Sequence, residues 1–151
     1  MARFTVTRDV AASAADAWAV LVDWPRHGDW VPLTTVRTLT PRPDGVGARF
    51  VARTGVGPLG FDDPMTVTVW EPPQGDRPGR CEVVKSGRVV LGSALFTVIP
   101  LGAARCRVAW TEDVTVLSRH ADPVVGFAGR FAFAATLRAF AKDAERAATR
   151  R

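Results

Sequence analysis

Apolar and polar residues alternate along much of the chain, which predicts a protein built mainly of β-strands. From Phe4 to Val10 every second residue is apolar except Arg8, the pattern of a strand with one buried face. The alternation returns from Thr34 onward and is interrupted by turns rich in Gly, Pro, Ser and Asp. Six further strands are predicted over residues 34–40, 48–54, 62–71, 80–86, 88–99 and 105–116.

A helical periodicity replaces the alternation between the first two strands. Ser13 stands at the N-cap position of a short helix whose buried stripe is formed by Trp18, Leu21 and Val22. Pro25 is expected to stop this helix, because the residue before a proline avoids helical geometry. A very short helical turn or a loop follows at 28–32.

The chain closes with one long helix, predicted to open at the Asp122-Pro123 pair and to run to about Ala148. Its C-terminal half is amphipathic, with apolar residues on one side and charged residues on the other. The segment 123–135 is instead apolar nearly all round, broken by Arg130 alone. Two explanations stay open for this segment: loops cover it, or it forms a pocket rim or a subunit contact.

The parity of the last strand suggests which of its side chains face the core. Arg105 and Arg107 share one face, which is therefore expected to be the solvent side. Trp110 and Glu112 then point inward, toward the closing helix. A carboxylate near an indole and apolar walls would have a raised pKa and could act as an acid or a base. The alternative is that Glu112 lies in water at the end of the strand.

Parity is less decisive in the other strands. In the third strand Phe50 is the expected inward residue, because Arg49 and Arg53 lie on the other face. In the fourth strand we expect the apolar set inside, which leaves Trp70 without a firm orientation; the set is Met65, Val67 and Val69. The sixth strand is apolar on both faces and cannot be oriented from its pattern.

The composition is that of an ordinary globular chain. Its 151 residues suit one domain, predicted to span 1–151, and 47% apolar with 23% charged residues are usual values. No stretch approaches the roughly 18 apolar residues of a membrane span. The first residues alternate like a strand and not like a signal peptide, so a cytoplasmic location is expected. The net charge of +5 comes from dispersed arginines, which favours a solvated surface over a nucleic-acid site.

Cysteine and histidine are present without the spacing of a metal site. Cys81 and Cys106 would lie about two strands apart in a meander, roughly 9–10 Å, so both are expected to be reduced packing residues. His27 is predicted to lie at the surface. His120 is either a proton shuttle at a pocket mouth or an ordinary loop residue. No zinc-type spacing results, and no metal is expected.

The segment Gly55–Gly60 matches the dinucleotide fingerprint G-x-G-x-x-G. That motif binds a nucleotide only where a strand turns into a helix. Here the alternating residues Thr66–Val69 of another strand follow. We therefore interpret the segment as a hairpin connection, and no cofactor is expected.

The order of these elements resembles that of the START-like (SRPBCC) superfamily, which includes polyketide cyclase/dehydrase-like, lipid-transport and birch pollen allergen-like proteins. The resemblance covers essentially the whole chain and rests on residues 11–18, Asp23-Trp24-Pro25, Trp30-Val31-Pro32, Pro72-Pro73 and the last hairpin at 100–110. It implies an α+β helix-grip fold: a seven-stranded antiparallel sheet wrapped around the long C-terminal helix, with two short helices between strands 1 and 2. It also implies an enclosed hydrophobic cavity.

Two functions for such a cavity follow as hypotheses. The first is binding of a hydrophobic small molecule, such as a polyketide, lipid or isoprenoid. The ligand-binding residues would then be Phe50, Val67, Val69, Phe96, Val108, Trp110, Phe127 and Phe131. The alternative is a polyketide cyclase, aromatase or dehydratase in which Glu112, with Arg53 or His120, moves protons. The chain has no tyrosine, which departs from cyclase relatives that often use this residue.

A third hypothesis is an interaction module or a quinone-handling protein, and it rests only on the apolar segment 123–135. For the first two hypotheses the expected partner is a hydrophobic small molecule. Neither nucleic acid nor stable membrane insertion is expected, and the chain is expected to be a monomer or a homodimer.

Overall fold

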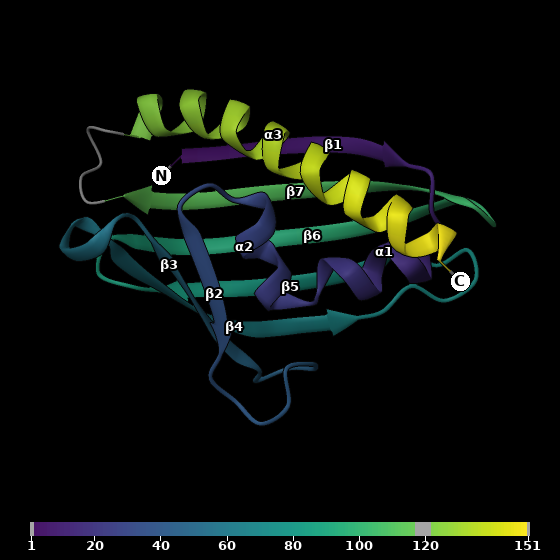
Figure 1. The fold of residues 1–151 in the computed structure, drawn as a ribbon, viewed down its shortest axis with the longest axis horizontal. Helices are drawn as coiled ribbons and strands as arrows, with labels where there is room; N and C mark the ends of the chain where they lie inside the picture. The colour runs from purple at the N-terminus through teal and green to yellow at the C-terminus, as the bar shows by residue number, and fades with distance from the viewer. Residues whose placement is uncertain (1, 117–121, 151) are drawn as a thin grey trace.

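Seven antiparallel strands form one curled sheet, and helices from both ends of the chain lie on its concave side (Figure 1). The computed structural model describes residues 2–116 and 122–150, with side chains outside 117–128. The strand order is β1-β7-β6-β5-β4-β3-β2, so every strand from β2 to β7 pairs with its neighbours in sequence. The strands are β1 (Ala2–Val10), β2 (Thr34–Thr38), β3 (Arg49–Thr54), β4 (Phe61–Glu71), β5 (Gly79–Ser86), β6 (Val90–Gly102) and β7 (Arg105–Val116).

Short helices join β1 to β2, and one long helix follows β7. They are α1 (Ala14–Leu21), the 3-10 turn η1 (Trp24–Arg26), α2 (His27–Trp30) and α3 (Asp122–Thr149). The Ser13 side chain accepts a hydrogen bond from the Asp16 N–H at 3.1 Å, which confirms the predicted N-cap. Pro25 lies in η1, where its fixed φ suits the first turn and its missing N–H costs nothing.

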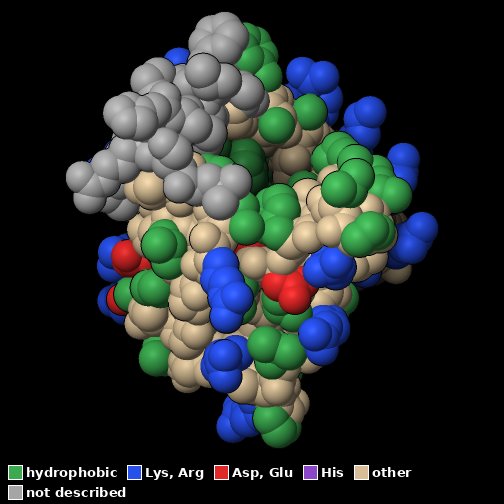
Figure 2. All heavy atoms as spheres, turned by 90° about the vertical axis from the view of Figure 1, so that its left-hand side faces the viewer, with side chains coloured by type: hydrophobic (Ala, Val, Ile, Leu, Met, Phe, Trp, Pro, Cys, Tyr) green, Lys and Arg blue, Asp and Glu red, His purple; other side chains and the backbone are tan. Residues whose placement is uncertain are grey.

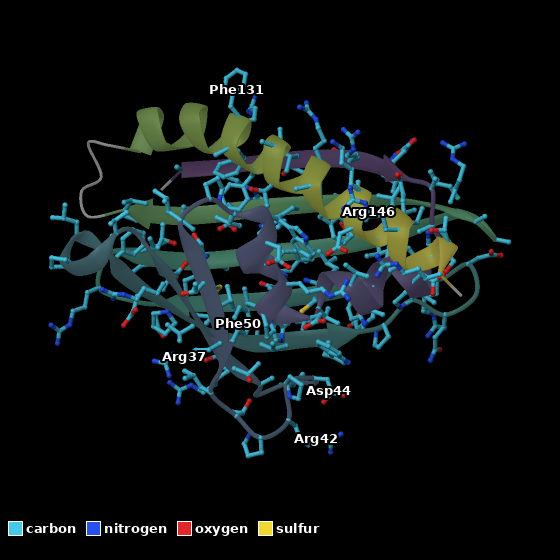
Figure 3. All side chains as sticks on the ribbon, viewed as in Figure 1. Arg37, Arg42, Asp44, Phe50, Phe131 and Arg146 are labelled. Atoms are coloured by element: carbon cyan, nitrogen blue, oxygen red, sulfur yellow. The ribbon has the colours of Figure 1, made fainter. Side chains whose placement is uncertain are left out.

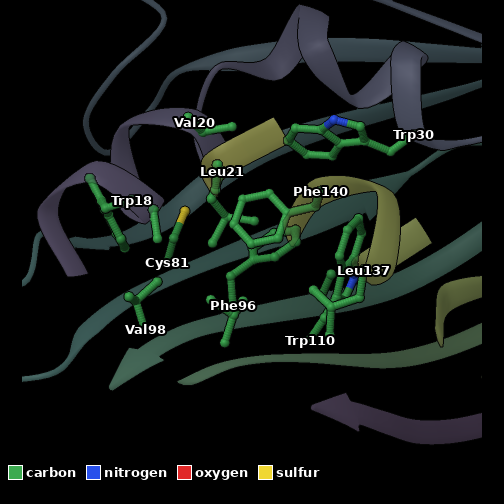
Figure 4. Packing of buried hydrophobic residues seen from close by; sticks show 14 of the residues in the cluster. Trp18, Val20, Leu21, Trp30, Cys81, Phe96, Val98, Trp110, Leu137 and Phe140 are labelled. Carbon is green, nitrogen blue, oxygen red and sulfur yellow. The ribbon is translucent and has the colours of Figure 1, made fainter. Parts of the chain in front are cut away.

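The core lies between the concave face of the sheet and these helices (Figure 4). Leu137 and Phe140 of α3 reach toward the sheet residues Phe96 and Trp110. The ring of Trp30 in α2 packs edge-on against Phe140, with ring centroids 5.1 Å apart. Burial of such large aromatic side chains is the main stabilising contribution in a core of this kind.

Polar contacts fix α3 against the short helices. Asp143 of α3 accepts a hydrogen bond from Trp30 Nε1 at 3.2 Å and one from Arg26 Nη1 at 3.3 Å. The indole of Trp24 also donates to the carbonyl oxygen of Pro43 at 2.8 Å. These hydrogen bonds fix η1 and α2 in position, so the helical surface that faces the sheet is fixed as well.

The predicted fold class is confirmed, and each predicted strand is found within a few residues of its expected bounds. The connection Gly55–Gly60 joins β3 to β4 through the 3-10 turn η2 (Gly57–Leu59), as the hairpin interpretation required. Cys81 and Cys106 are free and buried, as predicted. Among the helices described, none is long and apolar enough to cross a membrane.

Two strand orientations are decided only by the structure. In β6 the inward residues are Ala94, Phe96 and Val98, all nearly inaccessible to solvent. In β4 the pairing with β5 shifts between Val67 and Val69. This irregularity turns Trp70 toward the core, where its ring lies 5.3 Å from that of Trp18. The expected inward orientation of Val69 is therefore wrong, because a bulge reverses the alternation after Val67.

Candidate ligand-binding cavity

A cavity of about 270 Å³ lies between the concave face of the sheet and the helices. Its walls are mostly apolar; Phe50, Phe96 and Trp110 come from the sheet, while Phe133 comes from α3. Gly129 of α3 also lines the cavity, and a Cβ atom there would come within 2.7 Å of the Phe4 ring. The absence of a side chain at this position therefore lets α3 approach β1 closely.

The cavity extends to one end of the sheet. Thr54, Phe61, Val90 and Val116 line it and stand at the ends of β3, β4, β6 and β7 that meet there (Figure 1). Figure 2 looks onto this end of the molecule and shows a hollow with hydrophobic side chains beside it, while Lys and Arg side chains lie below it and to the right.

Three ionisable side chains from different strands meet on the apolar wall. Asp63 of β4, Lys85 of β5 and Glu112 of β7 all line the cavity, and all three are buried. Lys85 Nζ donates a hydrogen bond to Asp63 Oδ2 at 2.7 Å and lies 3.8 Å from Glu112 Oε2. A weaker contact of 3.6 Å joins Lys85 Nζ to the sulfur of Met65.

Glu112 is oriented by the indole two residues before it. Trp110 Nε1 donates to Glu112 Oε1 at 2.8 Å. Both side chains point to the concave side because they are two residues apart in the same strand. Glu112 is only 3% exposed, so the alternative that it lies in water at a strand end is excluded.

Burial and charge act against each other in this cluster. Burial raises the pKa of Glu112 above its ordinary value, and the Lys85 ammonium and the Trp110 N–H only partly oppose this effect. Burial alone would lower the pKa of Lys85, but the carboxyl groups of Glu112 and Asp63 outweigh it and the pKa is raised. Lys85 is therefore charged, and Glu112 keeps its proton to a higher pH than an exposed glutamate.

His27 lies inside the molecule, so its predicted surface position is wrong. The side chain lines the cavity and is only 6% exposed. Its Nε2 lies 2.7 Å from the carbonyl oxygen of Leu21, so this nitrogen carries the hydrogen. Burial lowers the pKa of His27 to about 4, and the neighbouring Lys85 charge acts in the same direction. The imidazole is therefore neutral near pH 7.

The predicted site residues fall into three groups. Phe50, Phe96, Trp110 and Glu112 line the cavity. Val67 and Val108 are buried in the core without lining it. Val69, whose expected inward orientation is wrong, is only partly buried and does not line the cavity either. Four further residues are placed away from the cavity or lie outside the described side chains, namely Arg53, Phe131, His120 and Phe127.

Arg53 and Phe131 both face away from the cavity. Arg53 lies on the side of β3 opposite Phe50; it donates to Asp62 Oδ1 and to the carbonyl oxygen of Gly57, both at 3.1 Å. Phe131 is 65% exposed and points away from the sheet (Figure 3). Neither residue supports the role that its sequence position suggested. The side chains of His120 and Phe127 lie outside the described residues.

Sequence reasoning missed Asp63, Lys85 and His27. Lys85 has the same strand parity as the buried residues Cys81 and Val83, and it is one of only two lysines in the chain, so parity could have found it. Asp63 shares parity with Met65 in the same way. His27 gave no such signal, because α2 is too short to show a period. In the described part of the chain, no group of three or more His, Cys, Asp or Glu residues could hold a metal ion.

The curled sheet, the helix α3 that it grips and the cavity between them are the features of a helix-grip fold. The structure is similar to the Zhui aromatase/cyclase from a Streptomyces species, with a TM-score of 0.74 and 21% identity over 95% of this chain and 93% of that chain. It is also similar to a START superfamily protein from Mycobacterium smegmatis, with a TM-score of 0.75 and 18% identity over 95% and 97% of the two chains. At these identities the likeness shows the fold alone.

A third similar structure is norcoclaurine synthase from Thalictrum flavum, with a TM-score of 0.61 and 20% identity over 93% of this chain and 84% of that chain. No curated protein matches the chain. The family model described as "Polyketide cyclase / dehydrase and lipid transport" matches residues 1–150. The chain belongs to this family.

Proposed function

We propose that the protein binds a hydrophobic small molecule in the cavity between the sheet and α3. The observation that carries the proposal is the wall of aromatic and aliphatic side chains around a volume of about 270 Å³. Small-molecule sites usually combine such an apolar lining with a few convergent polar groups. Here the polar groups include Asp63, Lys85 and Glu112, with His27 nearby in the lining.

The volume limits the size of the ligand. An apolar cavity of about 150 Å³ accommodates benzene, and this cavity, at about 270 Å³, is nearly twice as large. A ligand of two fused rings therefore fits. Phe50, Phe96 and Trp110 would contact it directly, whereas Val67 and Val108 would support the wall from the core.

Titration with tetralin, a bicyclic hydrocarbon, tests the proposal. We expect saturable binding that changes the fluorescence of Trp110, which lines the cavity. Ligand at one hundred times its dissociation constant should add about 2.7 kcal/mol to the free energy of unfolding. For a chain of this size this gain raises the melting temperature by roughly 5–10 °C. Native mass spectrometry of protein purified from its own host would then identify the natural ligand.

A matched pair of variants separates cavity binding from surface binding. Ala52→Leu adds a side chain to the cavity wall and should weaken tetralin binding. Ala104→Leu makes the same change in the exposed hairpin between β6 and β7 and should leave binding intact. Equal affinity in both variants, or no binding to the wild-type protein, contradicts the proposal.

The second candidate function is a polyketide cyclase, aromatase or dehydratase. The observation that favours it is the buried Glu112 beside Lys85, because a carboxyl group with a raised pKa is suited to proton transfer. In that case Glu112→Gln should abolish turnover and leave ligand binding intact. Unchanged turnover in this variant would reject the role of Glu112.

A further inference from the structure

Glu112 carries an oxygen atom that accepts no hydrogen bond from the described residues. Its Oε1 accepts from Trp110, but Oε2 has only Lys85 Nζ nearby, at 3.8 Å, which is too long for a hydrogen bond. The glutamate is nevertheless 97% buried, as its 3% exposure shows, and it lines the cavity. A buried polar atom of this kind normally has a partner.

Lys85, next to Glu112 Oε2, has N–H donors that are not used in strong hydrogen bonds. Its ammonium group has three N–H donors, and Asp63 Oδ2 takes one of them at 2.7 Å. The contact with the Met65 sulfur, at 3.6 Å, is weak. Two atoms 3.8 Å apart can both lie at about 2.8 Å from a third atom. One ligand oxygen can therefore contact Lys85 Nζ and Glu112 Oε2 together.

The charge balance determines which hydrogen bonds this ligand oxygen can form. The cluster contains two carboxyl groups and one ammonium group, and an uncompensated buried charge is costly. Asp63 accepts a hydrogen bond directly from the Lys85 ammonium, at 2.7 Å. Glu112 is farther from the ammonium, at 3.8 Å, and burial raises its pKa above the ordinary value. When Glu112 holds its proton, the O–H is at Oε2, because Oε1 accepts from the Trp110 N–H.

We infer that Lys85 Nζ and the protonated Glu112 Oε2 form a two-donor site for a carbonyl oxygen, and that the cavity selects bicyclic ketones. A carbonyl oxygen has two lone pairs and no hydrogen, so it matches two converging donors. A ligand hydroxyl would need an acceptor for its own hydrogen; Asp63 Oδ1 has no hydrogen-bond partner among the described residues, but it is buried from solvent. The inference rests on the proposed function and specifies the ligand class.

The test compares 1-tetralone with tetralin, which has the same rings without the carbonyl group. Calorimetry gives the association constant of each compound, and the measured quantity is the constant of 1-tetralone divided by that of tetralin. The ratio should fall about tenfold or more in Glu112→Leu, because a hydrogen bond involving a charged or acidic donor is lost. Glu112→Gln should keep the wild-type ratio, because its amide N–H still donates.

Lys85 is tested in a double variant, Lys85→Met with Asp63→Asn. Removing the lysine alone would leave the buried carboxylate of Asp63 without a partner and could prevent folding. We expect the tetralone-to-tetralin ratio to fall about tenfold in the double variant. The carbonyl stretch of bound 1-tetralone should lie at lower frequency in the wild-type protein than in this variant, because two donors polarise the bond.

The pH dependence supplies an independent readout. The charged and titratable groups around Glu112 are Lys85, Asp63 and the neutral His27. As the pH rises through the pKa of Glu112, its donor becomes an acceptor, so tetralone affinity should fall while tetralin affinity stays constant. In Glu112→Gln this fall should disappear.

The outcomes distinguish the inference from the function on which it rests. If tetralin binds but the ratio is the same in all variants, or if 1-tetralol binds more tightly than 1-tetralone, the two-donor site is overturned and the proposed function stands. If neither compound binds to the wild-type protein, both are overturned.

Discussion

At the scale of single residues, His27 and Glu112 show how burial sets the charge of a side chain. His27 is neutral because desolvation lowers its pKa to about 4. Glu112 is pushed toward its neutral form by the same cause. The two groups change the free energy of unfolding in opposite directions as the pH rises, because a proton adds charge to histidine and removes charge from glutamate.

For His27 we predict a loss of stability on acidification. The unfolded chain takes up a proton near pH 6.5, whereas the folded chain does so only near pH 4. Stability contributed by the neutral ring is therefore complete above pH 6.5 and lost as the pH falls to about 4. The difference corresponds to roughly 3 kcal/mol. Urea unfolding of wild type and of His27→Gln between pH 7.5 and 4 measures it.

The difference in free energy of unfolding between the wild type and His27→Gln isolates the contribution of His27 from that of Glu112. His27→Gln should flatten this part of the profile, since the glutamine amide can still donate to Leu21 but does not titrate. His120→Gln removes the other histidine of the chain and serves as the control. A profile for His27→Gln that is as steep as that of the wild type would show that the ring is not held neutral.

Residue orientation could be predicted where a strand has one charged face. In β7 the outward Arg105 and Arg107 pair with Asp9 of β1, at 3.3 and 2.7 Å, and Trp110 and Glu112 face inward as expected. An inward lysine could not be predicted with the same ease. Lys85 is stable there only because two other strands bring carboxyl groups to it.

At the scale of elements, the alternating pattern predicts strands but not their irregularities. The shift between Val67 and Val69 in β4 changes which residues face the core, and no local signal announces it. In β6 both faces are apolar, so its orientation depends on the neighbouring strands. The role of Gly129 in the long helix likewise depends on a neighbouring strand. Only the position of the Phe4 ring of β1 shows why a side chain would not fit at residue 129.

One glycine within β6 allows a prediction for this element. Gly92 has φ 136°, and a Cβ atom there would lie 2.1 Å from the carbonyl oxygen of Asp113 in β7. Gly92→Ala should destabilise the protein by about 3 kcal/mol or more, because backbone strain adds to a clash with backbone atoms. Chemical denaturation measures the change.

Gly75 provides the matched control for this substitution. It also has a positive φ, 55°, but an added Cβ would meet no atom within 4 Å. Gly75→Ala should therefore cost only the conformational strain, about 1 kcal/mol. Similar costs for the two variants would mean that the contact between Gly92 and β7 is not as close as described.

At the scale of the whole molecule, the two cysteines report on global opening. Cys81 in β5 and Cys106 in β7 flank β6 and are fully buried. Burial raises the pKa of Cys81 to about 12 and that of Cys106 to about 11. Because the thiolate is the reactive form, both thiols are protected as long as the sheet and its covering helices stay together.

We therefore predict that a thiol reagent labels the native protein only through global unfolding. The labelling rate at high reagent concentration should equal the unfolding rate measured by fluorescence. In denaturant both cysteines of the chain should react immediately, because unfolding exposes their thiols. Rapid labelling of one thiol under native conditions would reveal local opening of the sheet at that residue.

The order of the elements, the fold class and the inward face of β7 follow from the pattern of residues alone, because periodicity and turn residues are local properties of the chain. The polar groups that line the cavity become evident only when the strands are placed side by side. Asp63, Lys85 and Glu112 come from β4, β5 and β7, and His27 comes from a helix of four residues. Their protonation and contacts depend on distances between strands and on burial, and neither exists until the sheet has closed around α3.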